Sequence, residues 1–268
     1  MFDLLIKGGL VLDGAANPGI FLSVAIKDNR IHLLRGDISN IKAHRTIDAT
    51  GKVVSPGFID VHAHSGLVIL SKPEHMPKVH QGVTTELIGI DGNSYAPFHD
   101  SADLNRMVQI NSGLDGDPKI DYDWNTVTDY LDKFDKKVSV NIAYVVGNSP
   151  LRVGAMGWTA NKPSAKQLDQ QKGLLREAMQ EGAFGISTGL DYPPGNYADT
   201  DELVDIAKES SPKTTSTSGK ISTRTFKARL NKVSPPKTKF LLSLPIRRLF
   251  PPANRTPVIS WLIVMQHK

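Results

Sequence analysis

The sequence predicts an α/β protein in which a small N-terminal β domain precedes part of a (β/α)8 barrel of the TIM type. Residues 2–50 hold short apolar runs separated by turns, whereas strand and helix patterns alternate from residue 53 onward. Polar side chains follow the ends of successive predicted strands. Alternation of this kind implies parallel strands with right-handed crossovers, and the strand ends of such a barrel carry the chemistry.

The N-terminal domain is predicted over residues 1–52 as a small β-sandwich-type unit. Apolar residues 22–26 lead through a polar turn into the apolar residues 31–34. Two such runs joined by a short turn are typical of a β-hairpin. This domain therefore holds β structure and no predicted catalytic residue.

The barrel is predicted over residues 53–209. Its clearest helix begins at Ser164, which can cap the helix together with Gln167 three residues on. Residues 138–146 form a continuous apolar run, as expected of a strand buried on both faces of a parallel sheet. Residues 94–126 are predicted as a polar loop. The other expected elements are helix 74–81, strand 83–89, helix 127–134, strand 183–188 and a helix from residue 200.

The last 59 residues differ from the rest of the chain in charge. Residues 210–268 contain 12 Lys and Arg and no Asp or Glu, whereas residues 1–209 carry 20 basic and 27 acidic side chains. A basic, Ser/Thr/Pro-rich tail can bind nucleic acid or an anionic membrane, but its aromatic residues are too far apart for a single-strand binder. No nucleic-acid or membrane partner is therefore expected. We interpret the tail as the product of a truncation or reading-frame change after about residue 209.

Cysteine usage and hydropathy narrow the class of protein. The chain has no cysteine, so it can form neither a disulfide framework nor a thiolate metal site. Any metal must be held by His, Asp or Glu. The sequence has no apolar run long enough to span a bilayer, and its N-terminus lacks the features of a signal peptide. The cytoplasm is the expected location.

Two histidines follow the first predicted barrel strand. Residues 56–64 read Pro-Gly-Phe-Ile-Asp-Val-His-Ala-His, a turn followed by a short apolar strand. Side chains on a strand alternate between its faces, so His62 and His64 are expected to point the same way. Two imidazoles on one face at a strand end make a donor pair for a divalent metal such as zinc.

Five segments carry a resemblance to known enzymes. The residues 185–195, Gly-Ile-Ser-Thr-Gly-Leu-Asp-Tyr-Pro-Pro-Gly, are the most specific of them. On these segments, residues 3–209 resemble the amidohydrolase superfamily and, within it, the N-acyl-D-amino-acid deacylase (D-aminoacylase) family. The other four are residues 5–14 (LIKGGLVLDG), 56–64 (PGFIDVHAH), 81–85 (QGVTT) and 147–152 (GNSPLR).

The resemblance implies His62 and His64 as ligands of one or two divalent metal ions, with zinc expected. The family commonly has a metal-binding cysteine in a Gly-Asn-Cys-Gly turn after its second strand. That turn here reads Gly-Ile-Asp-Gly, so Asp91 stands at the position of the cysteine. A carboxylate oxygen is an acceptable zinc ligand. The alternative for Asp91 is an ordinary Asp-Gly turn.

The resemblance also implies two substrate-binding residues. Tyr192 matches a tyrosine of the family that contacts the substrate, and its phenol can donate a hydrogen bond to a carboxylate or an amide oxygen. The alternative is a half-buried loop aromatic beside two prolines. Arg152 could pair with a substrate carboxylate through its planar guanidinium, and a structural salt bridge is the other interpretation.

The implied activity is metal-assisted hydrolysis of a non-peptide C–N bond, with a small N-acyl-D-amino acid as the substrate. A cyclic-amide hydrolase of the dihydroorotase or hydantoinase kind is an alternative. Two further histidine ligands and an aspartate that acts as general acid and base in the family have no counterpart here. The sequence contains no histidine between His99 and His267 and no acid beyond Glu209. The catalytic residue is thus unassigned, and a catalytically incomplete fragment is the third alternative.

Overall fold

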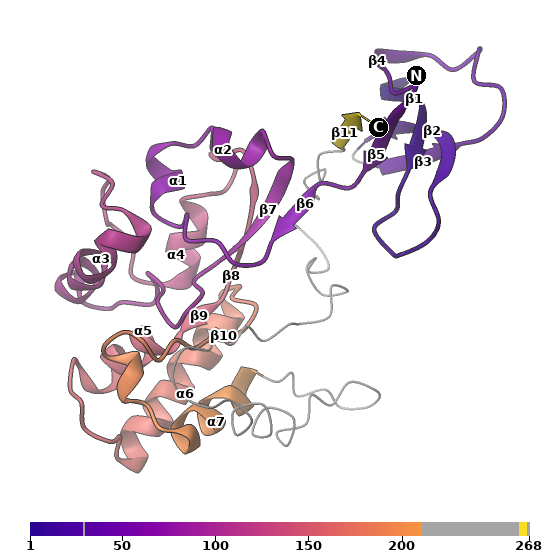
Figure 1. Ribbon diagram of the computed structural model, residues 1–268. Coiled ribbons are helices and arrows are strands. Elements are labelled where there is room, and N and C mark those ends of the chain that lie inside the picture. The colour runs from indigo at the N-terminus through magenta and orange to yellow at the C-terminus, as the bar shows by residue number, and fades with distance from the viewer. Residues whose placement is uncertain (29, 211–262, 267–268) are drawn as a thin grey trace. The chain divides into compact units, whose positions relative to one another are not determined.

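The structure is a computed structural model that describes residues 1–28, 30–210 and 263–266 (Figure 1). The chain divides into two compact units. The first contains residues 1–59, 76–85 and the described residues 263–266, and the second contains residues 60–75 and 86–210. The α/β class and the partial barrel expected from the sequence are confirmed.

The first unit is built on a six-stranded sheet with the order β11-β5-β1-β2-β3, in which β4 also pairs with β1. The predicted hairpin is present, because β2 and β3 pair antiparallel. Strand β1 pairs in parallel with both β4 and β5. A second sheet that would complete a sandwich is not found among the described residues. The strands are β1 (Phe2–Val11), β2 (Ile20–Lys27), β3 (Arg30–Leu34), β4 (Ala43–Asp48), β5 (Lys52–Ser55) and β11 (Ile263–Gln266).

Strand β11 comes from the predicted tail and pairs antiparallel with β5, with Ile263 opposite Ser55. The remaining predictions about the tail concern residues 211–262 and 267–268, which lie outside the described residues. The domain boundaries predicted at residues 52 and 209 stay predictions.

The barrel strands follow one another in chain order. The strands β6 (Phe58–Asp60), β7 (Val83–Ile88) and β8 (Asn141–Tyr144) form one sheet, and β9 (Val146–Gly147) pairs in parallel with β10 (Ile186–Ser187). Strands β6 and β7 run in the same direction, since the Phe58 amide donates to Gly82 and the Ala63 amide donates to Leu87. The run predicted as one strand over residues 138–146 is divided between β8 and β9.

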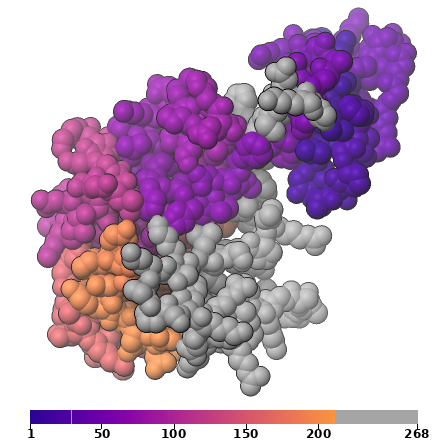
Figure 2. Space-filling model, in the orientation of Figure 1, coloured from indigo at the N-terminus to yellow at the C-terminus, as the bar shows by residue number. Residues whose placement is uncertain are grey.

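Seven α-helices accompany these strands in the described part of the chain. The predicted capping of α6 is confirmed, because Ser164 and Gln167 form a reciprocal capping box. In the space-filling view, the pink, salmon and orange parts of the chain pack against one another (Figure 2). The helices are α1 (Val68–Ser71), α2 (Met76–Val79), α3 (Ser101–Asp115), α4 (Val127–Asp132), α5 (Asn148–Met156), α6 (Ala165–Gln180) and α7 (Thr200–Ala207).

The prediction of a polar loop over residues 94–126 was wrong, because α3 occupies much of it. The helix begins after Asp100, whose carboxylate accepts a hydrogen bond from the Ala102 amide. Its buried face carries Leu104, Met107 and Val108, spaced as one side of a helix. That apolar stripe is short and continues through a polar residue, so the helical period is weak in the sequence.

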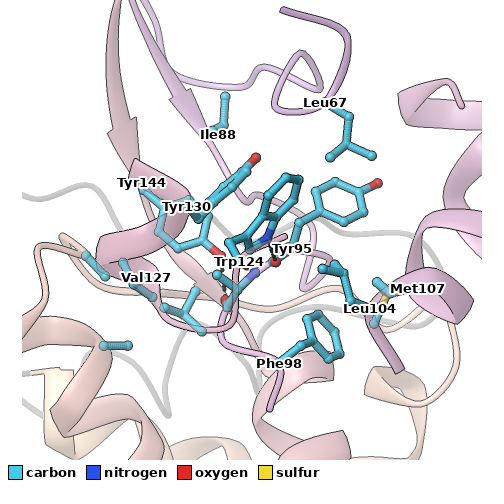
Figure 3. Packing of buried hydrophobic residues seen from close by; sticks show 14 of the residues in the cluster. Leu67, Ile88, Tyr95, Phe98, Leu104, Met107, Trp124, Val127, Tyr130 and Tyr144 are labelled. Atoms are coloured by element: carbon cyan, nitrogen blue, oxygen red, sulfur yellow. Dashed lines mark hydrogen bonds between the residues drawn. The ribbon is translucent and has the colours of Figure 1, made fainter. Parts of the chain in front are cut away.

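The core of the barrel unit is rich in aromatic side chains (Figure 3). The ring of Tyr130 lies 5.0 Å from that of Trp124 and 5.4 Å from that of Tyr144, measured between centroids. Aromatic pairs at such distances contribute about 0.5–1.5 kcal/mol each beyond their buried area. This core supports the loops that follow β6 and β7. In the part of the chain that the structure describes, no helix has both the length and the apolar character needed to cross a bilayer.

We expect Gly89→Ala to lower the free energy of unfolding by about 3 kcal/mol or more. Gly89 has a φ of +80°, and a Cβ there would overlap the carbonyl oxygen of Val145 and the ring of Tyr144. Urea unfolding followed by circular dichroism measures the change. Gly113→Ala is the matched control, since Gly113 lies in α3 with open space around it. This control should be neutral or stabilising by up to about 1 kcal/mol, and equal losses in both variants would contradict the prediction.

Candidate metal centre

The two histidines lie directly after β6 rather than inside a strand. Backbone pairing with β7 nevertheless continues past the end of β6, since the Ala63 amide donates to the Leu87 carbonyl at 3.1 Å. Ala63 is buried, and the side chains of His62 and His64 remain 37% and 22% exposed. The alternation expected of a strand therefore holds across these three residues.

Asp91 follows β7 in a tight turn. Its φ is +57°, and its neighbours Gly89 and Gly92 have φ values of +80° and +71°. Aspartate tolerates this left-handed conformation better than most residues. The turn directs the Asp91 side chain inward, where it is only 4% exposed.

The three predicted ligands converge. The Nε2 atoms of His62 and His64 each lie 3.3 Å from Oδ2 of Asp91, and one donor atom from each residue lies within 4.8 Å of the others. Ligand atoms 2.0–2.1 Å from a tetrahedral zinc ion are separated by about 3.3–3.4 Å. A direct hydrogen bond between a charged imidazole and a carboxylate is shorter, about 2.7–2.9 Å. The two distances to Asp91 therefore fit donors arranged around a shared cation.

The other nitrogen of His64 contacts a second carboxylate. Its Nδ1 lies 2.7 Å from Oδ1 of Asp115, and the phenol of Tyr95 donates to Oδ2 of Asp115 at 2.6 Å. Burial, followed by the charge of Asp115, raises the pKa of Tyr95 far above its ordinary value, so this phenol stays a donor. A small cavity borders His64, Tyr95 and Asp115, together with Asn93.

The guanidinium of Arg152 forms a buried ion pair with Glu202. Its guanidinium is fully buried, its Nη1 donates to both carboxylate oxygens of Glu202 at 2.6 Å, and its Nη2 donates to the Asn161 carbonyl at 2.7 Å. Gln171 donates to the same carboxylate at 3.1 Å. The structural salt bridge, the alternative interpretation of Arg152, is thus the arrangement observed.

Tyr192 lies in the loop after β10 and is half-buried. Its carbonyl oxygen accepts a hydrogen bond from the Asn196 amide at 2.9 Å, which fixes the backbone of the loop. Its role toward a substrate stays a prediction. Sequence reasoning missed Asp115 and Tyr95, both of which fall in the segment predicted as a loop.

Comparison with known proteins shows which family this chain matches. The model of the Amidohydrolase family matches residues 45–211, more than half of the chain. A D-aminoacylase from Alcaligenes xylosoxydans xylosoxydans is 36% identical over 208 residues, which are 77% of this chain and 42% of that protein. The match ends close to Glu209, where the sequence changes character.

Two solved structures are similar in fold. A D-aminoacylase with a binuclear metal centre has a TM-score of 0.68 and 35% identity, over 78% of this chain and 43% of that one. An N-acyl-D-glutamate deacylase from Bordetella bronchiseptica, complexed with zinc and a phosphonate inhibitor, has a TM-score of 0.67 and 33% identity, over 78% and 42%. The chain thus spans about two fifths of the length of these relatives. The resemblance drawn from its motifs is confirmed, and the chain belongs to the amidohydrolase family.

Proposed function

We propose that this chain binds a divalent metal ion, with zinc expected, through His62, His64 and Asp91, and that it serves the hydrolysis of N-acyl-D-amino acids. One observation carries the proposal: two imidazoles and one buried carboxylate converge at the ends of the first two barrel strands. Ligands at strand ends are where a (β/α)8 barrel presents its chemistry.

The donor set suits zinc. Neutral imidazole nitrogens and a carboxylate oxygen are its ordinary ligands, and the three residues leave a coordination position for water or substrate. A zinc ion bound there would lower the pKa of a bound water and polarise the scissile carbonyl. His62 is the more exposed of the two histidines, so it would line the side of the site that is open to solvent. We propose that the site binds one or two divalent metal ions.

The substrate class follows from the relatives. Three relatives at 36–37% identity are named a D-aminoacylase, an N-acyl-D-aspartate deacylase and an N-acyl-D-glutamate deacylase, which favours a deacylase over a hydrolase of cyclic amides. Tyr192 keeps its proposed role as a donor to the substrate. Arg152 is engaged by Glu202, so we no longer assign it to the substrate. A small-molecule substrate and a cytoplasmic location remain parts of the proposal.

The catalytic acid and base stay unassigned in this chain. The donors that the family takes from later strands have no counterpart in its sequence. The alternative of a catalytically incomplete fragment therefore predicts zinc binding without turnover.

Metal analysis combined with an activity assay separates these functions. The full chain is freed of metal with a chelator, dialysed and titrated with zinc, and bound zinc is then counted by mass spectrometry. The loaded protein is incubated with N-acetyl-D-amino acids, their L-enantiomers and a cyclic ureide. We expect zinc to bind and the D-enantiomers to be cleaved. Bound zinc with no turnover would identify the incomplete fragment, cleavage of the ureide alone would favour the cyclic-amide hydrolase, and absence of zinc binding would overturn the proposal.

A further inference from the structure

A second carboxylate holds the side of His64 that faces away from Asp91. Nδ1 of His64 and Oδ1 of Asp115 are 2.7 Å apart, and the Asp115 side chain is 5% exposed. Asp115 is the last residue of α3, 51 positions from His64 in sequence. A separate element thus reaches the imidazole from behind the site.

Tyr95 in turn holds Asp115. Its hydroxyl donates to Oδ2 of Asp115 at 2.6 Å, and its carbonyl oxygen accepts a hydrogen bond from the indole Nε1 of Trp124 at 2.7 Å. Tyr95 and Trp124 both lie in the aromatic core, which is drawn in Figure 3. Both oxygens of the Asp115 carboxylate are therefore engaged, and the chain of contacts ends in the buried aromatic core.

An imidazole beside a carboxylate carries its proton on the nitrogen that faces the carboxylate. His64 faces a carboxylate at both nitrogens, but Nδ1 lies 2.7 Å from Oδ1 of Asp115, a hydrogen-bond distance, whereas Nε2 lies 3.3 Å from Oδ2 of Asp91. The shorter contact favours the proton on Nδ1 and leaves the lone pair on Nε2 for a cation. His62 differs, because Asp91 is the one carboxylate that its ring nitrogens contact within the described residues. Two carboxylates thus contact the imidazole of His64, whereas one contacts that of His62.

We propose that Asp115 is a positioning residue that fixes the tautomer and the orientation of His64 for cation binding, and that Tyr95 holds Asp115 in place. The inference rests on the proposed function, since it assigns these two residues to the same metal centre. A carboxylate that orients a ligating histidine raises metal affinity, and its removal weakens binding by about 10–100-fold.

A purely structural role for Asp115 would also explain the contacts, because they fasten the end of α3. The two roles differ in what they change. If Asp115 has only a structural role, its replacement lowers the stability of the metal-free protein and leaves the tautomer of His64 and the intrinsic affinity for zinc unaltered. If Asp115 positions His64, its replacement changes both the tautomer of His64 and the affinity for zinc.

The test uses Asp115→Asn, Tyr95→Phe and the control Asp103→Asn in the full chain. Asp103 lies on the same helix and accepts a hydrogen bond from the indole of Trp158 at 2.6 Å. Its variant therefore makes the same chemical change in a hydrogen-bonded carboxylate that is not in contact with His62, His64 or Asp91. Zinc affinity is measured by competition with a chromophoric chelator. Asp115→Asn should bind zinc about 10–100-fold more weakly, Tyr95→Phe should show a smaller loss, and Asp103→Asn should match the unaltered chain.

The second readout is the tautomer itself. Long-range ¹H–¹⁵N spectra of the metal-free protein, with the His64 signals assigned through His64→Gln, should show a protonated Nδ1. In Asp115→Asn the side-chain amide can donate as well as accept, so the Nε2–H form should appear.

An Nε2–H tautomer of His64 in the unaltered chain would overturn the inference, even if Asp115→Asn does not fold. Equal zinc affinities of the unaltered chain and Asp115→Asn would overturn it too, and would leave the proposed function standing. If the unaltered chain binds no zinc, the proposed function falls and the inference falls with it.

Discussion

Glu202→Gln is expected to lower the free energy of unfolding by about 3–5 kcal/mol. The variant leaves the guanidinium of Arg152 without its counter-charge at a position where the residue is fully buried. A buried charge that loses its partner keeps the desolvation penalty and loses the attraction that offset it. Urea unfolding at neutral pH, monitored by far-UV circular dichroism, measures the difference.

Two comparisons identify the cause of that loss. Replacing both partners with apolar residues, Arg152→Met with Glu202→Leu, should recover most of the stability, because a well-packed apolar pair often replaces a buried ion pair without loss. Lys162→Ala removes the exposed ion pair with Asp199 and should have little effect. A loss for Glu202→Gln no greater than that for Lys162→Ala would show that the buried pair contributes nothing.

Asp91→Asn and His64→Gln are expected to abolish the stabilisation that zinc confers. Zinc at 100 times its dissociation constant should stabilise the unaltered chain by about 2.7 kcal/mol, because only the folded chain presents the converged donors. Each variant removes one of the three donors that lie within 4.8 Å of one another. Its affinity should fall by more than the roughly 10–100-fold that loss of an orienting partner causes. The shift of the melting temperature on zinc addition, measured by calorimetry, reports the effect.

The exposed residue His80 provides a control for this experiment. It lies outside the three-residue group, so His80→Gln should keep the full zinc-dependent shift. A shift that survives in both Asp91→Asn and His64→Gln would place the zinc elsewhere and contradict the assignment. A shift that disappears in all three variants would point to non-specific binding.

The parts of the site that the sequence could predict are those encoded locally. His62 and His64 are two residues apart, and alternation alone brings them to one side. Asp91 follows the next strand, and parallel neighbours end at the same edge of a sheet. The capping of α6 was equally readable, since Ser164 and Gln167 are three residues apart.

The parts that the sequence could not predict depend on distant contacts. Asp115 meets His64 across 51 positions, and its helix shows only a short apolar stripe. Arg152 offered two roles, and the choice depended on Glu202, 50 positions away. Local sequence patterns do not indicate which distant residue such a side chain will contact in the folded chain.

The three donors of the metal group lie close together along the chain. His62 and Asp91 are separated by 29 positions, and one strand, β7, completes the path between them. The entropy lost on closing a loop grows only with the logarithm of its length, so this short segment closes at modest entropic loss. The turn that carries Asp91 is held by a later strand, however, because the Ser187 hydroxyl in β10 donates to the Gly89 carbonyl at 2.5 Å and accepts from the Gly92 amide at 3.1 Å. On a ribosome, where the chain emerges from its N-terminus, the turn that presents Asp91 therefore gains these two hydrogen bonds only after β10 has been synthesised.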